Sequence, residues 1–322
     1  MLFRITLLTS VTMVVAMTDC ACGEEWNVSF QYVELSGLAK EKGVCRRDPS
    51  DVIYADGKYH VWYTKVTRDQ TVPGKHGYPS GYQGSVWHAS SADGQHWEEQ
   101  GEAIAKGGPG AFDCTATFTP NILSYKSKFY LYYTAVGPDF DNGPYEDRNR
   151  TTISVAESRS PSGPWRKHGR PVLESTRQAS CFDSYRVDDA CLVVRNDQVW
   201  LYYKGRQWEN TPRNTKMGVA IADTPLGEYR RANDGKPVQD SGHEVQIWPH
   251  DKVIMSLVSN TGPRGRTLQQ SLDGLRFDVI GQLPTNYPHA PGLFRADMSA
   301  LNPNAPASLW GVSMATYRGD PY

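Results

Sequence analysis

The sequence predicts an all-β fold, a five-bladed β-propeller with four strands in each blade. Three observations lead to this fold. A hairpin pattern recurs every seventy residues, with copies that end at Thr64, Thr134 and Lys204. A second strand pair follows each hairpin, and the N-terminal part of the chain offers a further strand that can close the ring. A two-sheet sandwich is the structural alternative, but that architecture does not require so regular a period.

Each hairpin is predicted from an apolar run, a polar turn and a second run rich in aromatic and β-branched residues. The first three copies read VIYADGKYHVWYT, ILSYKSKFYLYYT and LVVRNDQVWLYYK. A fourth hairpin covers residues 245–259, and a fifth combines residues 292–298 with residues 308–316. We expect these hairpins to supply the two inner strands of five blades.

The outer half of each blade is predicted from a strand, a Gly-bearing turn and an aromatic residue that opens a fourth strand. This second pattern occurs at residues 85–97, 153–165, 217–229 and 267–277. After Thr316 too little chain remains for two more strands. The strand predicted at residues 27–35 has no partner of its own, so we expect it to close the last blade and remove an exposed sheet edge.

The first 22 residues have the pattern of a secretory signal peptide, with a basic start at Arg4, an apolar stretch from Ile5 to Met17 and a short polar end. This stretch is too short to span a bilayer. The sequence therefore predicts an exported protein, periplasmic or extracellular, in which residues 23–322 form a single propeller domain.

The charge balance argues against nucleic acid as a partner. The chain has 34 Lys and Arg residues against 35 Asp and Glu residues, and it lacks a basic stripe with interleaved aromatic residues. No membrane partner is expected either. Four cysteines remain after the signal peptide: Cys45, Cys114, Cys181 and Cys191. They could form disulfides or fill the core as small apolar residues, and their spacing does not suit a metal site.

The same position in two hairpin repeats holds an aspartate. Asp48 and Asp188 stand eleven residues before Tyr59 and Val199, respectively. Both lie at the head of a predicted innermost strand. Because such strand heads converge on the axis of a propeller, we expect the two carboxylates to share one pocket. Strand alternation turns the neighbouring Asp189 away from Asp188, so a structural hydrogen-bonding role is expected for Asp189.

The fourth repeat places His243 and Glu244 at the head of its innermost strand. A histidine beside a carboxylate can hold a proton near neutral pH, as a general acid must. The sequence contains no Gly-x-Ser-x-Gly elbow, P-loop or HExxH motif, whereas paired acidic groups are what hydrolysis of a glycosidic bond requires. The predicted catalytic residues are therefore Asp48, Asp188, His243 and Glu244, and the predicted activity is that of a glycoside hydrolase.

Side chains that suit a sugar occur on loops of the same predicted rim, where flat apolar surfaces mix with hydrogen-bond donors. The predicted substrate-binding residues are Lys65, Thr119, Asn121, Tyr145, Arg206, Trp208 and His289. The expected partner is an oligosaccharide. This chemistry needs no cofactor or catalytic metal, although a structural cation could occupy the central channel.

At these residues the chain resembles the five-bladed propeller glycosidases, and among them glycoside hydrolase family 117 most closely. The resembling segments are RRDPSDVIYADGKYHVWYT, FTPNILSYKSKFYLYYT, SPSGPW, VDDACLVV and SGHEVQIWP. The resemblance implies an exo-acting, inverting enzyme that removes 3,6-anhydro-L-galactose from the non-reducing end of agar-derived oligosaccharides. It further implies Asp48 as general base, His243 as general acid, and Asp188 and Glu244 as carboxylates that orient the sugar and the imidazole. A homodimer is the oligomeric state that the resemblance suggests.

Glycoside hydrolase family 43 is a more distant resemblance, with arabinose or xylose as substrates. In that family the general acid is a glutamate, so Glu244 would replace His243 in this role. Two other functions stay open. A non-catalytic sugar-binding propeller would show similar polar residues in most blades, whereas an enzyme for anionic sugars would hold the negative charge with Arg206 and Lys65.

Overall fold

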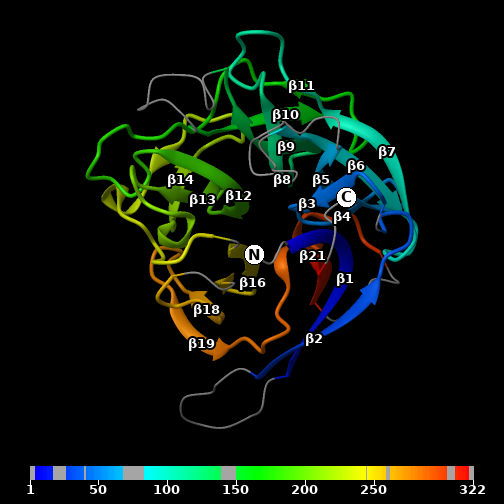
Figure 1. The fold of residues 1–322 in the computed structure, drawn as a ribbon. Coiled ribbons are helices and arrows are strands. Elements are labelled where there is room, and N and C mark those ends of the chain that lie inside the picture. The colour runs from blue at the N-terminus through cyan, green and yellow to red at the C-terminus, as the bar shows by residue number, and fades with distance from the viewer. Residues whose placement is uncertain are drawn as a thin grey trace.

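The strands form five antiparallel sheets around a common centre, in the part of the chain that the structure describes (Figure 1). The computed structural model describes residues 4–16, 27–39, 41–67, 83–138, 150–243, 245–258, 262–302 and 309–318. The protein therefore has an all-β fold of the β-propeller type, as the sequence predicts.

Four of the sheets are regular, with four strands each. The second sheet contains β8 (Ala116–Tyr125), β9 (Lys128–Val136), β10 (Thr152–Ser158) and β11 (Arg166–Lys167). The third contains β12 (Arg186–Arg195), β13 (Gln198–Arg206), β14 (Lys216–Ala222) and β15 (Arg230–Arg231). The fourth contains β16 (Val245–His250), β17 (Val253–Val258), β18 (Thr267–Ser271) and β19 (Asp278–Gln282). The last contains β20 (His289–Leu293), β21 (Leu309–Arg318), β1 (Arg4–Ala16) and β2 (Asn27–Glu34).

The first sheet departs from the predicted pattern because its innermost strand is divided in two. It contains β3 (Val44–Arg47), β4 (Ile53–Ala55), β5 (Lys58–Thr67), β6 (Ser85–Ser91) and β7 (Trp97–Ile104). Both β3 and β4 pair with β5. The prediction of five four-stranded blades is thus only partly right, since the structure has four regular four-stranded blades, not five.

The predicted hairpin turns are confirmed. Two-residue turns join β4 to β5, β8 to β9 and β12 to β13. Positive φ angles at both turn residues fit a type I′ turn, and they are found at Lys126 and Ser127 and again at Asn196 and Asp197. The seventy-residue period therefore reports a true structural repeat.

The last sheet contains the strand predicted at residues 27–35, and also a strand that was not predicted. β2 lies at its outer edge, and β1 lies between β2 and β21. β1 falls within residues 1–22, the predicted signal peptide. An apolar run of this length suits either a signal peptide or a buried strand, and periodicity alone does not distinguish the two. Removal of residues 1–22 stays a prediction.

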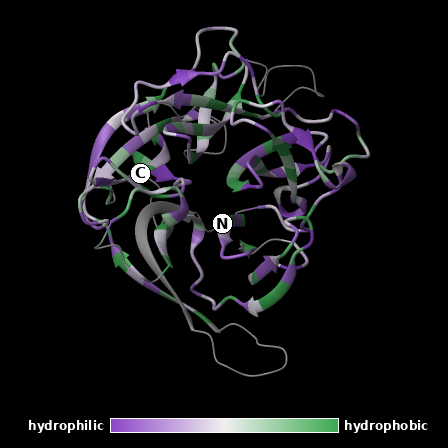
Figure 2. Ribbon diagram, turned by 180° about the vertical axis from the view of Figure 1, so that it is seen from behind, coloured by the Kyte–Doolittle hydropathy of each residue, from purple (hydrophilic) through white to green (hydrophobic). Residues whose placement is uncertain are grey.

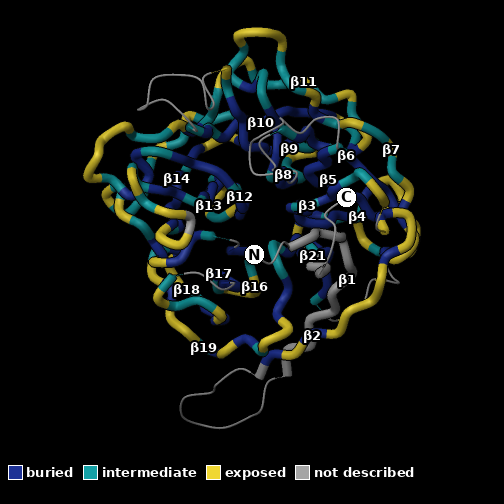
Figure 3. Tube along the Cα trace, in the orientation of Figure 1, coloured by how far each residue is buried: buried dark blue, intermediate teal, exposed yellow. Residues whose placement is uncertain are grey.

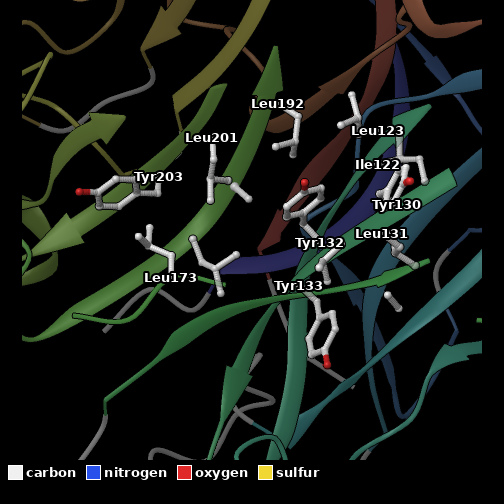
Figure 4. Close-up of a cluster of buried hydrophobic side chains, with 14 of the residues drawn as sticks. Ile122, Leu123, Tyr130, Leu131, Tyr132, Tyr133, Leu173, Leu192, Leu201 and Tyr203 are labelled. Atoms are coloured by element: carbon white, nitrogen blue, oxygen red, sulfur yellow. The ribbon is translucent and has the colours of Figure 1, made fainter. Parts of the chain in front are cut away.

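Apolar side chains fill the space between neighbouring sheets. The largest cluster has residues from the first three sheets, and in it Leu131 and Tyr132 of β9 pack with Leu192 and Leu201 of the third sheet (Figure 4). The inner strands are mostly buried and the outer strands and loops are mostly exposed (Figure 3). The strands β5 and β9 are buried along nearly their whole length, as expected for sheets covered on both faces, whereas burial alternates along the outer strand β7. Figure 2 shows the hydrophobic and hydrophilic residues along the sheets.

Helical structure is confined to short turns in the described residues. The 3-10 helices are η3 (Pro212–Asn214), η4 (Asn233–Gly235) and η5 (Ala296–Met298). None of the described helices has the length and apolar character needed to cross a membrane.

Candidate active site

The innermost strands of four sheets carry the same irregularity. Asp48, Thr119, Asp189 and Ala290 all have positive φ angles, between 40° and 51°. The pairing register shifts beside the last three, which marks a β-bulge, and Asp48 lies in the gap between β3 and β4. Since a bulge adds an unpaired residue, the alternation of side chains between the two faces of a sheet fails at this point.

A proline follows three of these four residues, namely Pro49, Pro120 and Pro291, whereas Ala190 follows Asp189. Proline has no N–H group to donate to a sheet, so it is tolerated at a bulge but not in the middle of a regular strand. The X-Pro pairs are thus a sequence signal for the bulges. Pro49 aligns with Pro120, and the seventy-residue period aligns Thr119 with Asp189. The counterpart of Asp48 is therefore Asp189 rather than Asp188.

The bulges surround a pocket where the innermost strands of the five sheets meet. It is lined by Asp48, Pro49, Thr119, Pro120, Asn121, Asp189, Ala190, Cys191, Val245, Gln246, Ala290 and Pro291. Its volume is about 60 Å³, which leaves room for several water molecules. Two carboxylates from different blades, those of Asp48 and Asp189, therefore open into one cavity.

Asp48 is held by the residue before it. The Arg47 guanidinium donates from Nε to Oδ2 of Asp48 at 2.7 Å and from Nη2 to Oδ1 at 3.3 Å. The side chain of Asp48 is 9% exposed. A two-pronged, charge-assisted contact of this kind fixes the orientation of a carboxylate and offsets the cost of burying its charge.

Asp189 is paired with Lys204, which lies on the neighbouring strand β13. Burial alone would raise the pKa of Asp189, but the ion pair and hydrogen bond with Lys204 outweigh it and lower the pKa below its usual value. Asp189 is therefore ionised at neutral pH. Its Oδ2 contacts Lys204, whereas its Oδ1 has no hydrogen-bond partner in the described part of the chain.

Asp188 lies elsewhere than predicted. Its side chain is only 4% exposed and does not line the pocket. Its Oδ1 stands 3.4 Å from Nζ of Lys204. Burial raises the pKa of Asp188, the adjacent Asp189 raises it further, and Lys204 opposes both effects. The sequence assigned the pocket to Asp188 and a structural role to Asp189, whereas Asp189 is the residue that lines the pocket, because the bulge interrupts the alternation of side chains.

His243 lies at the head of β16, within electrostatic reach of Asp189 and of three cations, Lys204, Arg47 and Arg206. Burial and these cations lower the pKa of His243 to about 3, against a smaller opposing effect of Asp189. The imidazole is therefore neutral at neutral pH. This is not the protonated state that a resting general acid requires. Glu244, the fourth predicted catalytic residue, lies outside the described residues.

Two of the predicted substrate-binding residues line the pocket, Thr119 and Asn121. The Asn121 amide, however, is engaged within the protein. Its Oδ1 accepts hydrogen bonds from the N–H groups of Asp51 and Ile122, at 3.1 and 2.8 Å, and its Nδ2 donates to the carbonyl of Ala190 at 2.8 Å. Asn121 thus joins the first three sheets beside the pocket.

The other predicted binding residues that the structure describes do not line the pocket. The Lys65 ammonium donates to Oε1 of Glu99 at 2.5 Å and lies 3.7 Å from the ring centre of Trp87, so its charge is used within the first sheet. Arg206 is buried at the end of β13. Trp208 packs edge-on against a neighbouring tyrosine ring, and the His289 ring contacts that of Tyr287. Tyr145 lies outside the described residues.

A fully buried ion pair lies behind the pocket lining, and we call it and its hydrogen-bond partners the axial clasp. Asp51 accepts hydrogen bonds from Nε2 of Gln246 at 2.6 Å and from Nη1 of Arg295 at 2.8 Å. Arg295 also donates to the carbonyl of Leu192 at 2.9 Å, and the Asp51 N–H donates to Asn121. All five sheets are joined by these contacts. The clasp therefore ties the innermost strands of the five sheets together beside the pocket lining.

No cluster of three or more potential metal ligands occurs among the described residues. The cysteines Cys45, Cys114, Cys181 and Cys191 are free thiols in the structure. A guanidinium, that of Arg295, supplies positive charge beside the buried carboxylate of Asp51 near the axis.

Comparisons with known proteins identify the type of enzyme. A family model described as glycosyl hydrolases family 43 matches residues 46–206, which is half of the chain and includes Asp48, Asp189 and Lys204. The chain belongs to glycosyl hydrolase family 43. The pocket with its two carboxylates is thus found in a glycoside hydrolase, as the sequence predicts. Among proteins with curated functions, none matches the chain.

Solved structures with the same fold are also glycosidases. The chain is similar to Zg3597, a family 117 glycoside hydrolase of the marine bacterium Zobellia galactanivorans, with 28% identity, 88% of this chain and 90% of that chain covered, and a TM-score of 0.71. A structure described as a glycoside hydrolase shows 16% identity, 89% and 91% coverage and a TM-score of 0.59. A GH43_1 enzyme of Xanthomonas citri shows 14% identity, 84% and 87% coverage and a TM-score of 0.51. The predicted resemblance to families 117 and 43 is confirmed, and the last two structures support the fold alone.

Proposed function

We propose that this glycoside hydrolase is an exported, exo-acting and inverting enzyme that releases a terminal sugar of the anhydrogalactose type from galactan oligosaccharides. The observation that carries the proposal is the position of Asp48 and Asp189 at equivalent bulges around one pocket. The similarity to a family 117 enzyme supports the class of substrate.

The exo mode of action is supported by the shape of the site. Asp51 and Arg295 are fully buried, and Asp51 contacts the lining residues Asn121 and Gln246, which supports a pocket closed on that side in the described part of the chain. A pocket closed at one end accepts the end of a sugar chain, whereas cleavage within a chain needs an open groove. A terminal sugar would enter between Asp48 and Asp189.

Asp48 is proposed as the general base. An inverting glycosidase holds a water molecule between its base and the anomeric carbon, so the base and the acid must be roughly 6.5 to 9.5 Å apart. The Arg47 contact fixes the Asp48 carboxylate, and the pocket has room for the water. Asp189 is ionised by Lys204 and would accept hydrogen bonds from sugar hydroxyls or stabilise the positive charge that develops on the ring.

Glu244 is proposed as the proton donor. A general acid must hold a proton at the working pH. Burial and nearby cations lower the pKa of His243 to about 3, which argues against the imidazole in this role. The family 43 match favours a carboxylic acid in this role, and Glu244 is the next residue in the chain. His243 would then serve as a neutral hydrogen-bonding group at the edge of the site.

Product analysis tests the proposed function. Neoagaro-oligosaccharides, arabino-oligosaccharides and xylo-oligosaccharides would be incubated with the wild type and with Asp48→Asn, and the products analysed by NMR. We expect release of the non-reducing terminal sugar from the agar-type substrates by the wild type alone. Release of arabinose or xylose instead would keep the hydrolase and overturn the proposed substrate.

A non-catalytic sugar-binding propeller is the function that this experiment must exclude. Repeated sugar sites would place similar polar residues in most blades, but the equivalent bulge residues are Asp48, Thr119, Asp189 and Ala290. Binding of an oligosaccharide without any product would contradict an enzymatic function.

The proposal of export rests on residues 1–22. The mass of the protein recovered from the periplasm or the medium tests whether these residues are removed.

A further inference from the structure

A second, larger concavity lies at the β13–β14 loop and the segments before β16 and β18, and we call it the side pocket. It is lined by Gln207, Asn210, Arg213, Asn214, Lys216, Asp240, Gly262 and Pro263. Its volume is about 610 Å³, which is within the range of about 300 to 1,000 Å³ that is usual for ligand pockets. The described part of the chain provides no occupant for it.

The side pocket opens on the same rim as the catalytic pocket. Residues 207–216 connect the end of β13 to the start of β14, and the end of β13 pairs with the start of β12, as Lys204 does with Asp188. Asp240 lies three residues before His243, at the approach to β16. An oligosaccharide with its terminal sugar at Asp189 could therefore extend into the side pocket.

The charge of the side pocket is positive. Neither Arg213 nor Lys216 has an ion-pair partner among the described residues, which include the carboxylate of Asp240 in the same lining. Asp240 instead lies 3.4 Å from the Arg264 guanidinium. Two cations without partners in a concave site attract an anionic group.

Amide side chains form one wall of the side pocket and are held in place. Nε2 of Gln207 donates to the carbonyl of Ala179 at 2.7 Å, and Nδ2 of Asn210 donates to Oε1 of Gln207 at 3.3 Å. Asn214 donates to Oδ1 of Asn210 at 3.4 Å. Fixed amides beside cations suit a ligand that carries both hydroxyl groups and a negative charge, as an acidic sugar does.

Gly262 also lines the side pocket, close to the backbone of Asp240. Its φ is +84°, and a Cβ at this position would lie 2.2 Å from Oγ of Ser241. Any larger residue would strain the backbone and move this wall. Gly262 therefore cannot be replaced by another residue without a shift of this wall.

From the sequence, Lys65 and Arg206 were the residues suggested to bind an anionic sugar. In the structure neither of them lines the side pocket. Lys65 is paired with Glu99, and Arg206 is buried at the end of β13. We propose that the side pocket, through Arg213 and Lys216, is a subsite for a sugar that bears a sulfate or carboxylate group. This inference rests on the proposed function, because it places the anionic sugar behind the terminal sugar that is cleaved.

A charge-removing variant tests the side pocket. The double variant Arg213→Ala/Lys216→Ala would be compared with Lys58→Ala/Arg276→Ala, which removes the same charge from exposed residues at turns of the opposite rim. The substrates are neutral neoagaro-oligosaccharides, sulfated galactan oligosaccharides and uronate-bearing galactan oligosaccharides, so that sulfate and carboxylate are separated. KM and kcat are measured for each pair, with and without added salt.

We expect the side-pocket variant to raise KM for one class of anionic substrate by roughly ten-fold to a hundred-fold, as for the loss of hydrogen bonds to a charged group. Its kcat and its KM for the neutral substrate should stay as in the wild type and the control variant. Added salt should reduce the preference of the wild type for the anionic substrate. An equal KM change for neutral and anionic substrates, or no change for either, would overturn the proposal.

A binding measurement separates this inference from the proposed function. Calorimetric titration of a sulfated oligosaccharide into the Asp48→Asn variant needs no turnover. Binding that is lost on adding the Arg213→Ala/Lys216→Ala changes supports the side pocket even if no substrate is hydrolysed. Hydrolysis of neutral substrates, together with no binding of any anionic one, would remove the subsite and leave the enzyme.

Discussion

Two adjacent aspartates offer a matched pair of substitutions, Asp188→Asn and Asp189→Asn. Both residues interact with Lys204, but only Asp189 lines the pocket. Asparagine has nearly the same shape as aspartate, so each substitution removes a charge with little change in volume. The expected effects on activity therefore differ only if the position of the side chain decides the function.

Asp189→Asn should lower kcat/KM by roughly 10²- to 10⁴-fold, the usual range for a group that acts in the transition state, or about 3 to 5 kcal/mol in the barrier. Asp188→Asn should leave kcat/KM within about ten-fold of the wild type. Its buried carboxylate already has a raised pKa, and the Lys204 charge would still be met by Asp189. Both variants should also show a lower unfolding free energy, by about 0.5 to 3 kcal/mol.

The assay is the initial rate of terminal sugar release from a neoagaro-oligosaccharide at several concentrations. Thermal unfolding of both variants shows whether a loss of activity comes from a loss of fold. Equal losses of kcat/KM in the two variants, or near wild-type activity in Asp189→Asn, would refute the role assigned to the bulge.

Three further predictions follow from buried charges and from the site. His88 is buried, and desolvation lowers its pKa to about 3. Below about pH 6.5 the unfolded chain therefore binds a proton that the folded protein does not. Chemical denaturation should show that the unfolding free energy falls by up to about 1.4 kcal/mol for each unit by which the pH is lowered from 6 to 4, and a rise would contradict this. Arg295→Met leaves the Asp51 carboxylate buried without its cation and should lower the unfolding free energy by about 3 to 5 kcal/mol, with partial recovery in Asp51→Asn/Arg295→Met; a single variant as stable as the wild type would contradict the clasp. Glu244→Gln should lower kcat by roughly 10²-fold or more, whereas His243→Gln should stay within about ten-fold, and the reverse order in steady-state kinetics would identify His243 as the acid.

The repeat architecture could be predicted because its signals are local. A polar two-residue turn between two β-rich runs fixes a hairpin, and its recurrence every seventy residues fixes the repeated sheets. The place of residues 27–34 at the edge of the last sheet followed from counting strands. β1 was missed because an apolar run near the N-terminus has the composition of a signal peptide as well as that of a strand.

The lining of the pocket was predicted only in part, because strand alternation does not hold across a bulge. Asp48 lines the pocket, but the same count from the hairpin selected Asp188, whereas Asp189 is the residue in the lining. The prolines at positions 49, 120 and 291 carried the missing information, since three inner strands share them at the point where the register shifts. Aligning the chain on those prolines would have placed Asp189 in the pocket.

Other parts of the site depend on contacts that sequence spacing does not show. Asn121 was predicted to bind substrate, but its amide is used to join three sheets. Lys65 is neutralised by Glu99, 34 residues further along the chain. The Asp51–Arg295 pair joins residues separated by 244 positions, and neither residue belongs to a recognisable motif. Such partners become visible only when the ring of sheets is closed.

The most direct test of the account is a crystal structure of Asp48→Asn with a bound neoagaro-oligosaccharide. The account predicts electron density for the terminal sugar in the pocket between positions 48 and 189, with an oxygen of Asp189 within hydrogen-bond distance of a sugar hydroxyl. Density for the sugar only at another surface, with the pocket filled by water, would contradict it.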